Sequence, residues 1–169
     1  GARALAAAIG NRGKVYVSNV KPGISTTDQR EAGFKEEMKK FPNITVLDTQ
    51  FNDNDANKAA SQLSAVLARN PDLAGVFGAN LFSAQGASNG VKTSNKRGVV
   101  NVVAFDCPES IINDVKNGDI DIAICQRPFE MGSVGVQYAV DVLNGKKVNA
   151  RYGTGYTVIT SRYRDIESE

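Results

Sequence analysis

The chain has 169 residues, a length that fits one ordinary domain and can bury a hydrophobic core without staples. Twenty lysines and arginines against 18 aspartates and glutamates give a net charge of +2, and these charges are scattered along the sequence. No nucleic-acid partner or anionic-membrane surface is therefore indicated, and the longest apolar runs are too short to span a bilayer.

The chain contains no histidine and two cysteines, Cys107 and Cys125. This removes most zinc sites and every Ser-His or Cys-His nucleophile within the chain, so no metal or cofactor is expected. The two cysteines permit a disulfide, but we expect them to be small buried residues near strand ends. The chain opens on Gly1 with no initiator Met or signal segment, and we expect an upstream segment to have been removed.

The chain begins with a helical pattern followed by a strand pattern. The alanine-rich segment 2–9 predicts a short helix, and the β-branched run 14–20 predicts a buried strand. Phe34, Met38 and Phe41 then recur at helical spacing, so one face of a second helix points to a core. A Pro-Asn pair ends that helix.

The middle of the chain continues this alternation. The run 44–51 predicts a strand, 74–80 predicts another, and 81–91 predicts a weak helix interrupted by glycines. Between the two strands lies a helical pattern with the apolar face Ala59, Leu63, Val66 and Leu67.

The last third contains the strongest patterns. The run 98–106 predicts a strand, Pro108 suits the first position of a helix, and 121–126 predicts a fifth strand. Pro128 opens the best helical pattern, and 154–161 is a final strand-like run. The apolar face of that helix comprises Met131, Val134, Gly135, Tyr138, Ala139, Val142 and Leu143.

Strands that alternate with helices are typical of a parallel sheet covered on both faces. We therefore predict an α/β fold: a three-layer, doubly wound, mainly parallel sheet of about five strands with helices on both faces. A flavodoxin-like strand order is the simplest topology. Ligands bind such sheets beyond the carboxyl ends of the strands, so the residues at those ends are the candidates for a site.

Every predicted strand end carries side chains that donate or accept hydrogen bonds, as a ligand with hydroxyl groups requires. The candidates are Asp28, Gln29, Arg30, Asn54, Asn80, Asp106 and Gln126.

Each candidate also has a structural alternative. Asp28 and Gln29 each lie three residues after a Ser or Thr, a spacing that resembles a capping box. Asp53 and Asp55 are expected to cap the next helix. The candidates after the later strands also suit ordinary turns and loops. Only their convergence on one edge of the sheet favours the functional interpretation.

Five blocks of sequence follow one another in a characteristic order: GKVYVSNVKPGISTTDQREAGF, VLDTQFNDNDANKA, NPDLAGVFGAN, NVVAFDCPESIINDVKNGDIDIAICQRPFEMGSVGV and TGYTVIT. The patterns FD-x-P, NG-x-I-x-A-x-x-x-Q-x-P and MG-x-x-G-V are the most specific. Together the blocks resemble the C-terminal lobe of a periplasmic ABC-transporter sugar-binding protein of the ribose-binding type. The resemblance covers essentially the whole chain.

The resemblance implies a two-lobed, non-catalytic receptor that closes on one sugar and presents it to a membrane permease. The ligand-binding residues it implies are Asn80, Asp106 and Gln126, with Asp28 and Gln29 beside them and with Arg30 and Asn54 as support. We expect Arg30 to brace Asp28 or a neighbouring carboxylate more than to touch the ligand.

Two positions depart from the ribose-receptor pattern. Asp28 stands where those receptors carry Arg, and Asn54 stands where they carry Phe. The Asp-Gln pair is similar to that of receptors for the furanosyl autoinducer, although Ala79 stands where those receptors carry Pro. These departures leave the identity of the sugar open.

On this resemblance, residues 1–169 form the C-terminal lobe, and the N-terminal lobe is missing from this chain. The helix over 128–144 would pack on that lobe. Without it, we expect the apolar face to repack on this lobe or to contact a second copy of the chain. The expected location is the periplasm or the cell exterior, with a lipid anchor in a Gram-positive host.

Two other functions fit the same fold. The effector-binding domain of a LacI-like transcription regulator shares it, although the TGYTVIT run fits the receptor better. An enzyme is the third alternative, since a fold does not fix a function. No activated nucleophile is evident, and sugar hydrolysis by Asp28 and Asp106 would require an acid of raised pKa.

Overall fold

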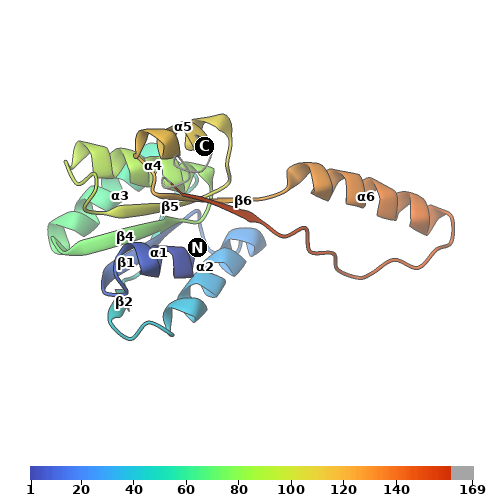
Figure 1. Cartoon of the computed structure of the whole chain (residues 1–169), viewed down its shortest axis with the longest axis horizontal. Helices are drawn as coiled ribbons and strands as arrows, with labels where there is room; N and C mark the ends of the chain where they lie inside the picture. Colours follow the sequence, from blue (N-terminus) through green and yellow to red (C-terminus); the bar gives the residue numbers. More distant parts are fainter. Residues whose placement is uncertain (161–169) are drawn as a thin grey trace, which may run out of the picture.

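The computed structural model describes residues 1–160, which fold around one seven-stranded sheet (Figure 1). The strands are β1 (Gly13–Asn19), β2 (Ile44–Val46), β3 (Gln50–Phe51), β4 (Leu73–Gly78), β5 (Asn101–Phe105), β6 (Ile122–Cys125) and β7 (Thr157–Thr160). The helices are α1 (Ala2–Ala8), α2 (Ser25–Met38), α3 (Ala56–Arg69), α4 (Leu81–Thr93), α5 (Glu109–Asn117) and α6 (Pro128–Leu143).

The strand order confirms the predicted doubly wound topology. The order is β2-β1-β4-β5-β6-β7, with β3 also paired to β1, and all pairs are parallel except β6 with β7. When β2 and β3 are taken together, the first five positions follow the flavodoxin-like order. The strand predicted over 44–51 is two short strands, and β7 is shorter than the predicted run, whose last residue, Ser161, lies outside the described residues.

Side chains on successive residues of β1 point to opposite faces of the sheet, and each face carries its own helices. Val15 and Val17 belong to a hydrophobic core that includes α1 and α2, whereas Tyr16 lies in a core built with α3, α4 and α5. Figure 1 shows these two helical layers on either side of the sheet. The predicted three-layer architecture is therefore confirmed.

Helix α6 belongs to neither layer. It projects away from the sheet, and the chain returns along residues 144–156 to form β7 (Figure 1). No residue of α6 is buried, and Phe129 and Leu143 are 90% and 86% exposed. The expectation that this helix repacks on the same lobe is thus wrong. Both faces of the sheet are already covered by the other helices.

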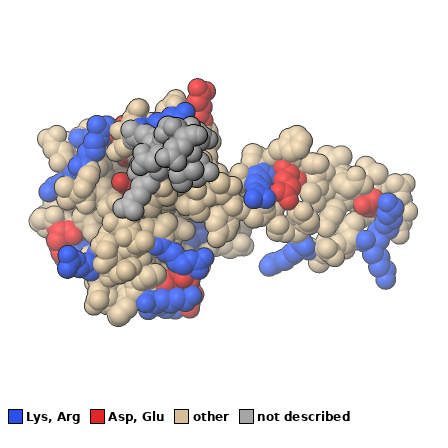
Figure 2. All heavy atoms as spheres, in the orientation of Figure 1, with Lys and Arg blue, Asp and Glu red and all other residues tan. Residues whose placement is uncertain are grey.

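The surface carries its charges singly or in small groups. Figure 2 shows Lys and Arg interspersed with Asp and Glu over the visible face, with broad uncharged areas along the projecting α6 region. Within residues 1–160, every helix falls short of the length and apolar character that a membrane crossing demands.

Candidate ligand-binding site

The sheet has its switch point between β1 and β4, and the candidate site lies at the carboxyl ends of these strands. Helix α2 follows β1 on one face, and α4 follows β4 on the other, so the two connections diverge here. Arg30 of α2 bridges the opening, where its Nη1 atom donates a hydrogen bond to the carbonyl oxygen of Ala79 at 2.9 Å.

Arg30 is more central than the sequence suggested. Its guanidinium lies over the ring of Phe105, 3.8 Å from the ring centroid. Burial lowers the pKa of Arg30, and the charge of Asp106 opposes that shift. Among the described residues, Arg30 makes no ion pair with Asp28, whose Oδ2 accepts a hydrogen bond from the Gly23 N–H at 2.9 Å. The carboxylate whose charge acts on Arg30 is therefore that of Asp106.

The capping-box prediction at the start of α2 is wrong. The helix does begin at Ser25, but its N-cap is Ile24, and no side chain caps it. The Asp28 carboxylate instead accepts a hydrogen bond from the Gly23 N–H in the preceding loop, which is a structural role of another kind.

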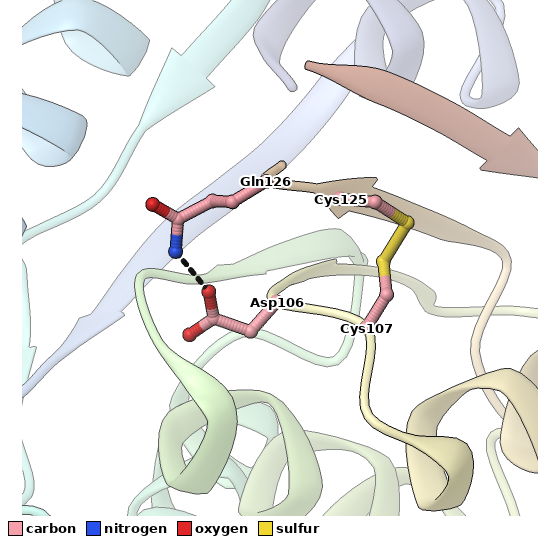
Figure 3. The surroundings of a disulfide bond; sticks show 4 residues. All are labelled: Asp106, Cys107, Cys125 and Gln126. Carbon is pink, nitrogen blue, oxygen red and sulfur yellow. Dashed lines mark hydrogen bonds between the residues drawn. A yellow bond between two sulfur atoms is a disulfide. The ribbon is translucent and has the colours of Figure 1, made fainter. Parts of the chain in front are cut away.

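Asp106 and Gln126 contact each other directly (Figure 3). The Gln126 side-chain Nε2 donates a hydrogen bond to the Asp106 carboxylate. The Asp106 backbone has a φ of 79°, in the left-handed region, and its N–H donates to the carbonyl oxygen of Ile124 at 3.0 Å. Asp tolerates this conformation better than most residues. Two of the candidates thus form one carboxylate–amide pair.

A disulfide joins Cys107 to Cys125 beside this pair, which corrects the expectation of two free buried cysteines (Figure 3). The two residues are 18 apart in sequence. Cys107 lies just beyond the end of β5, and Cys125 is the last residue of the neighbouring strand β6. Their Cα atoms are 5.1 Å apart, within the ordinary range for a disulfide. Strand adjacency, which the composition does not reveal, brings them together.

Two clefts open at this edge of the sheet, and Arg30 lines both. The first has a volume of about 480 Å³ and is also lined by Gln29, Phe105 and Gln126. The second, of about 460 Å³, is also lined by Asn54 and Asn80. Asp28 and Asp106 line neither cleft, although Asp106 lies one hydrogen bond behind Gln126.

Asn80 and Asn54 hold each other in place at the second cleft. Asn80 is the N-cap of α4, where its Oδ1 accepts hydrogen bonds from the backbone and hydroxyl of Ser83 at 3.1 and 2.6 Å. Its Nδ2 donates to Asn54 Oδ1 at 2.6 Å. Because the carbonyl is occupied, the remaining amide hydrogen of Asn80 is the group free to donate to a ligand.

The two expected caps of α3 behave differently. Asp55 is confirmed as the N-cap, and its side chain accepts from the backbone N–H groups of Asn57 and Lys58. Asp53 does not cap the helix but pairs with the Lys58 ammonium group.

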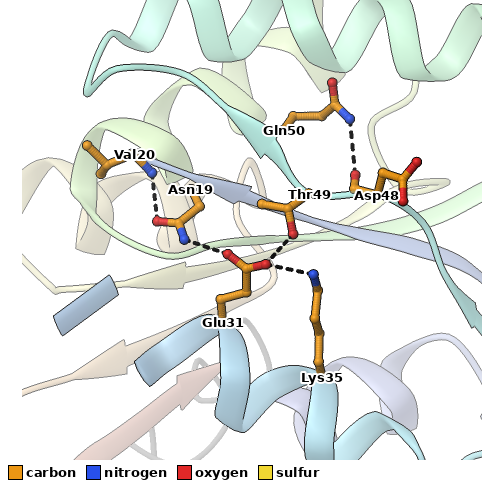
Figure 4. Close-up of polar contacts among 7 residues, drawn as sticks. All are labelled: Asn19, Val20, Glu31, Lys35, Asp48, Thr49 and Gln50. Atoms are coloured by element: carbon orange, nitrogen blue, oxygen red, sulfur yellow. Dashed lines mark hydrogen bonds and ion pairs between the residues drawn. The ribbon is translucent and has the colours of Figure 1, made fainter. Parts of the chain in front are cut away.

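Glu31, which the sequence analysis did not single out, anchors α2 beside the site (Figure 4). Its carboxylate accepts hydrogen bonds from Asn19 and Lys35, both at 2.6 Å, and from the Thr49 hydroxyl. Burial raises the pKa of Glu31, but these bonds outweigh it and leave the pKa below its ordinary value. Glu31 thereby ties α2 to β1 and to the link between β2 and β3, which positions the adjacent Arg30.

Three aromatic residues of the first cleft were also missed: Phe77, Phe105 and Tyr156. Phe77 stacks on Phe34 with ring centroids 4.7 Å apart. Phe105 precedes a candidate in a strand, and alternation alone would have placed it in the core. The position of the Arg30 guanidinium over the Phe105 ring is what associates Phe105 with the candidate site.

The donor set of this edge suits a neutral, polyhydroxylated ligand. It combines the Arg30 guanidinium and several side-chain amides with aromatic ring surface, and the Asp106 carboxylate lies one hydrogen bond behind Gln126. The remaining charged side chains of the lining, Arg3, Lys21, Glu37 and Asp53, are two of each sign. Within residues 1–160, no group of three His, Cys, Asp or Glu side chains is arranged to hold a metal ion.

Comparison with known proteins identifies the class. The family model of the periplasmic binding protein domain matches residues 1–147. The chain therefore belongs to the periplasmic binding protein family.

Individual relatives agree with this assignment. The chain is 32% identical over 156 residues to the ribose import binding protein of Haemophilus influenzae, covering 92% of this chain and 52% of that protein. It is 30% identical over 136 residues to the D-allose-binding periplasmic protein of Escherichia coli, covering 80% of this chain and 44% of that protein. The chain spans about half the length of the curated relatives it matches.

A solved structure is more similar still. The ABC transporter solute-binding protein of Agrobacterium vitis, bound with α-D-tagatopyranose, is 63% identical and superposes with a TM-score of 0.92. The match covers 95% of this chain and 54% of that one.

Proposed function

We propose that this chain is the C-terminal lobe of the solute-binding component of a sugar ABC importer. On this proposal it binds a monosaccharide between two lobes, and the closed receptor delivers the sugar to a membrane permease. The observation that carries the proposal is the convergence of Arg30 and Gln126 on one cleft at the switch point of the sheet, with Asp106 hydrogen-bonded to Gln126 behind it.

The chemistry of these groups supports a sugar rather than an ionic ligand. Within residues 1–160, Gln126 uses one amide hydrogen on Asp106, and its other amide hydrogen and its carbonyl are able to donate to and accept from hydroxyls. Asn80 adds a donor at the neighbouring cleft. A site of this kind rejects analogues that leave its buried polar groups unpaired.

The names of the relatives support the class of ligand. They bind ribose, D-allose or α-D-tagatopyranose, and none of these proteins is described as an enzyme or a regulator. The high identity to the tagatose-bound protein makes a ketohexose in its pyranose form the first ligand to test.

The arrangement of α6 supports a missing partner surface. Its exposed apolar residues lie on more than one side of the helix: Val136, Val140 and Leu143 form one face at 68%, 45% and 86% exposure, and Met131 and Val142 lie on the other side at 42% and 56%. A helix that is apolar on most sides belongs in an interface. We assign that interface to an N-terminal lobe, since the curated relatives are about twice as long as the match.

The periplasm is the compartment we propose. The E. coli relative is described as periplasmic, and the ribose relative is described as an import protein. The Cys107–Cys125 disulfide supports the same location, because disulfides persist in oxidising compartments.

A thermal-shift panel on the intact protein tests the proposal. D-tagatose, D-allose, D-ribose and a set of polyols are compared at 1 mM. One sugar is expected to raise the unfolding midpoint by about 5 °C if its concentration is about 100 times its dissociation constant. Absence of any shift across pentoses, hexoses and polyols would contradict the proposal.

A further inference from the structure

The disulfide lies directly beside two residues of the candidate site. Cys107 directly follows Asp106, and Cys125 directly precedes Gln126. The cross-link therefore joins the two backbone segments that carry the carboxylate–amide pair (Figure 3).

The pairing of β5 with β6 ends where the disulfide begins. Phe105 and Ile124 are the last partners in the register, and one further backbone hydrogen bond runs from Asp106 N to Ile124 O. Beyond this point the two chains separate, one toward α5 and the other toward α6. The disulfide is the covalent tie across this divergence.

Asp106 is a residue whose conformation requires such a tie. Its φ of 79° is uncommon for a residue with a side chain, and conformations of this kind persist where the surroundings fix them. The surroundings here are the backbone bond to Ile124, the side-chain bond from Gln126 and the neighbouring disulfide.

We propose that the Cys107–Cys125 disulfide is a positioning element of the ligand site, which holds Asp106 and Gln126 together before a ligand arrives. The inference rests on the proposed sugar-binding function. A pair that is already assembled loses less freedom on binding, so the ligand binds more tightly.

A purely structural disulfide would behave differently. Any cross-link that closes a loop of this length stabilises a fold by restricting the unfolded chain. That effect appears in the unfolding midpoint and leaves ligand affinity unchanged at temperatures far below it. The positioning role adds a loss of affinity that depends on the presence of Gln126.

A double-mutant cycle in the intact protein separates the two roles. The variant Cys107→Ala/Cys125→Ala is compared with wild type, and the same pair of changes is compared in a Gln126→Ala background. Each protein is titrated calorimetrically with D-tagatose, D-allose and D-ribose at a temperature well below its midpoint. Cys107→Val/Cys125→Ala, which retains more apolar volume, replaces the first variant if circular dichroism shows that variant to be unfolded.

We expect removal of the disulfide to weaken sugar binding about tenfold in the wild-type background and less than about twofold in the Gln126→Ala background. Equal losses in the two backgrounds, or no loss in the first, would overturn the positioning role.

A ligand-free readout keeps this test independent of the proposed function. The side-chain amide of Gln126 is identified in a ¹⁵N NMR spectrum by its disappearance in Gln126→Ala. It is expected at a dispersed position in wild type and near the position of a solvated amide without the disulfide. If no sugar binds wild type, the proposed function fails, and this spectrum still decides whether the disulfide orders the pair. An unchanged Gln126 resonance would overturn the inference.

Discussion

Arg30 shows what a sequence reveals about a single residue and what it does not. Its place at a strand exit predicted a polar residue near the ligand, and the structure brings it to both clefts. Its partners are Ala79, which directly follows β4, and Phe105, the last residue of β5, 49 and 75 positions further along the chain. No local pattern encodes such distant contacts, so its role as a bridge was not predictable.

Asp106→Asn is the most direct test at the residue scale. Asn tolerates the left-handed backbone, and its amide oxygen is able to accept from Gln126, so the unliganded midpoint should change by less than about 2 °C. Loss of the charged acceptor should weaken sugar binding about 10- to 100-fold in calorimetric titrations of the intact protein.

Asp72→Asn is the matched control for this change. It removes a carboxylate whose exposed ion pair with Lys14 lies outside both clefts. Affinity equal to that of wild type is expected. If the two variants lose affinity for the sugar to the same extent, the predicted role of Asp106 in sugar binding is contradicted.

Glu31 predicts a dependence of stability on pH. The folded protein holds the pKa of Glu31 below its ordinary value of 4.5, so the ionised form stabilises the fold above that value. This stabilisation is lost as the pH falls below about 4.5 and through the lower pKa of the folded state. Glu31→Gln should therefore lower the midpoint at pH 7 and flatten its decline between about pH 5 and pH 3.

Denaturant unfolding at several pH values measures this effect. Glu36→Gln serves as the control, because its ion pair with Lys39 is 72% exposed on both sides and contributes little. A decline in Glu31→Gln as steep as in wild type would show that other groups cause the acid sensitivity.

At the scale of elements, the sequence predicts what periodicity and composition encode. The alternation of strands and helices, the order of the sheet and the N-cap at Asp55 all followed from local patterns. The division of 44–51 into two strands did not, and Thr49, in the interval between them, donates a hydrogen bond to Glu31 of a distant helix, a contact that no local pattern encodes. The start of α2 also differed, since hydrogen bonding of Asp28 to the loop replaced the expected capping box.

The contact between α3 and α4 depends on Gly86, one of the glycines that lowered the helix propensity of this segment in the sequence analysis. A Cβ atom added to Gly86 would lie 2.3 Å from the Ala56 carbonyl oxygen and 2.4 Å from Ala59 Cβ. Gly86→Ala should therefore lower stability by about 1–3 kcal/mol, despite the better helix propensity of alanine.

Gly132→Ala is the matched control in α6, where an added Cβ meets nothing within 4 Å. In the 169-residue chain it should leave the urea midpoint unchanged or raise it slightly. A similar loss in both variants would show that the close approach of α3 and α4 is not the cause.

At the scale of the whole molecule, the exposed α6 is the feature most in need of a partner. In the 169-residue chain alone, we expect the apolar residues of α6 to drive association with a second copy. Sedimentation velocity should detect dimers that Leu143→Glu weakens, because the charge would lie in the contact. If the parent chain and the Leu143→Glu variant both sediment as monomers, this expectation is contradicted.

The strands β6 and β7 are antiparallel neighbours in the sheet, although 31 residues separate them in the sequence. Cys125 and Thr157 are Cα partners, so residues 126–156 leave and re-enter the sheet at adjacent points. In topological terms this segment is an insertion into a β-hairpin, and none of its residues is buried. Replacing it with an Asn-Gly turn should preserve cooperative thermal unfolding, with a midpoint within about 5 °C of the parent chain. Loss of the cooperative transition would show that the insertion supports the core. If the transition survives, the segment is dispensable for folding, and receptors of this class are able to exchange it, together with the site residue Gln126, while the sheet stays unchanged.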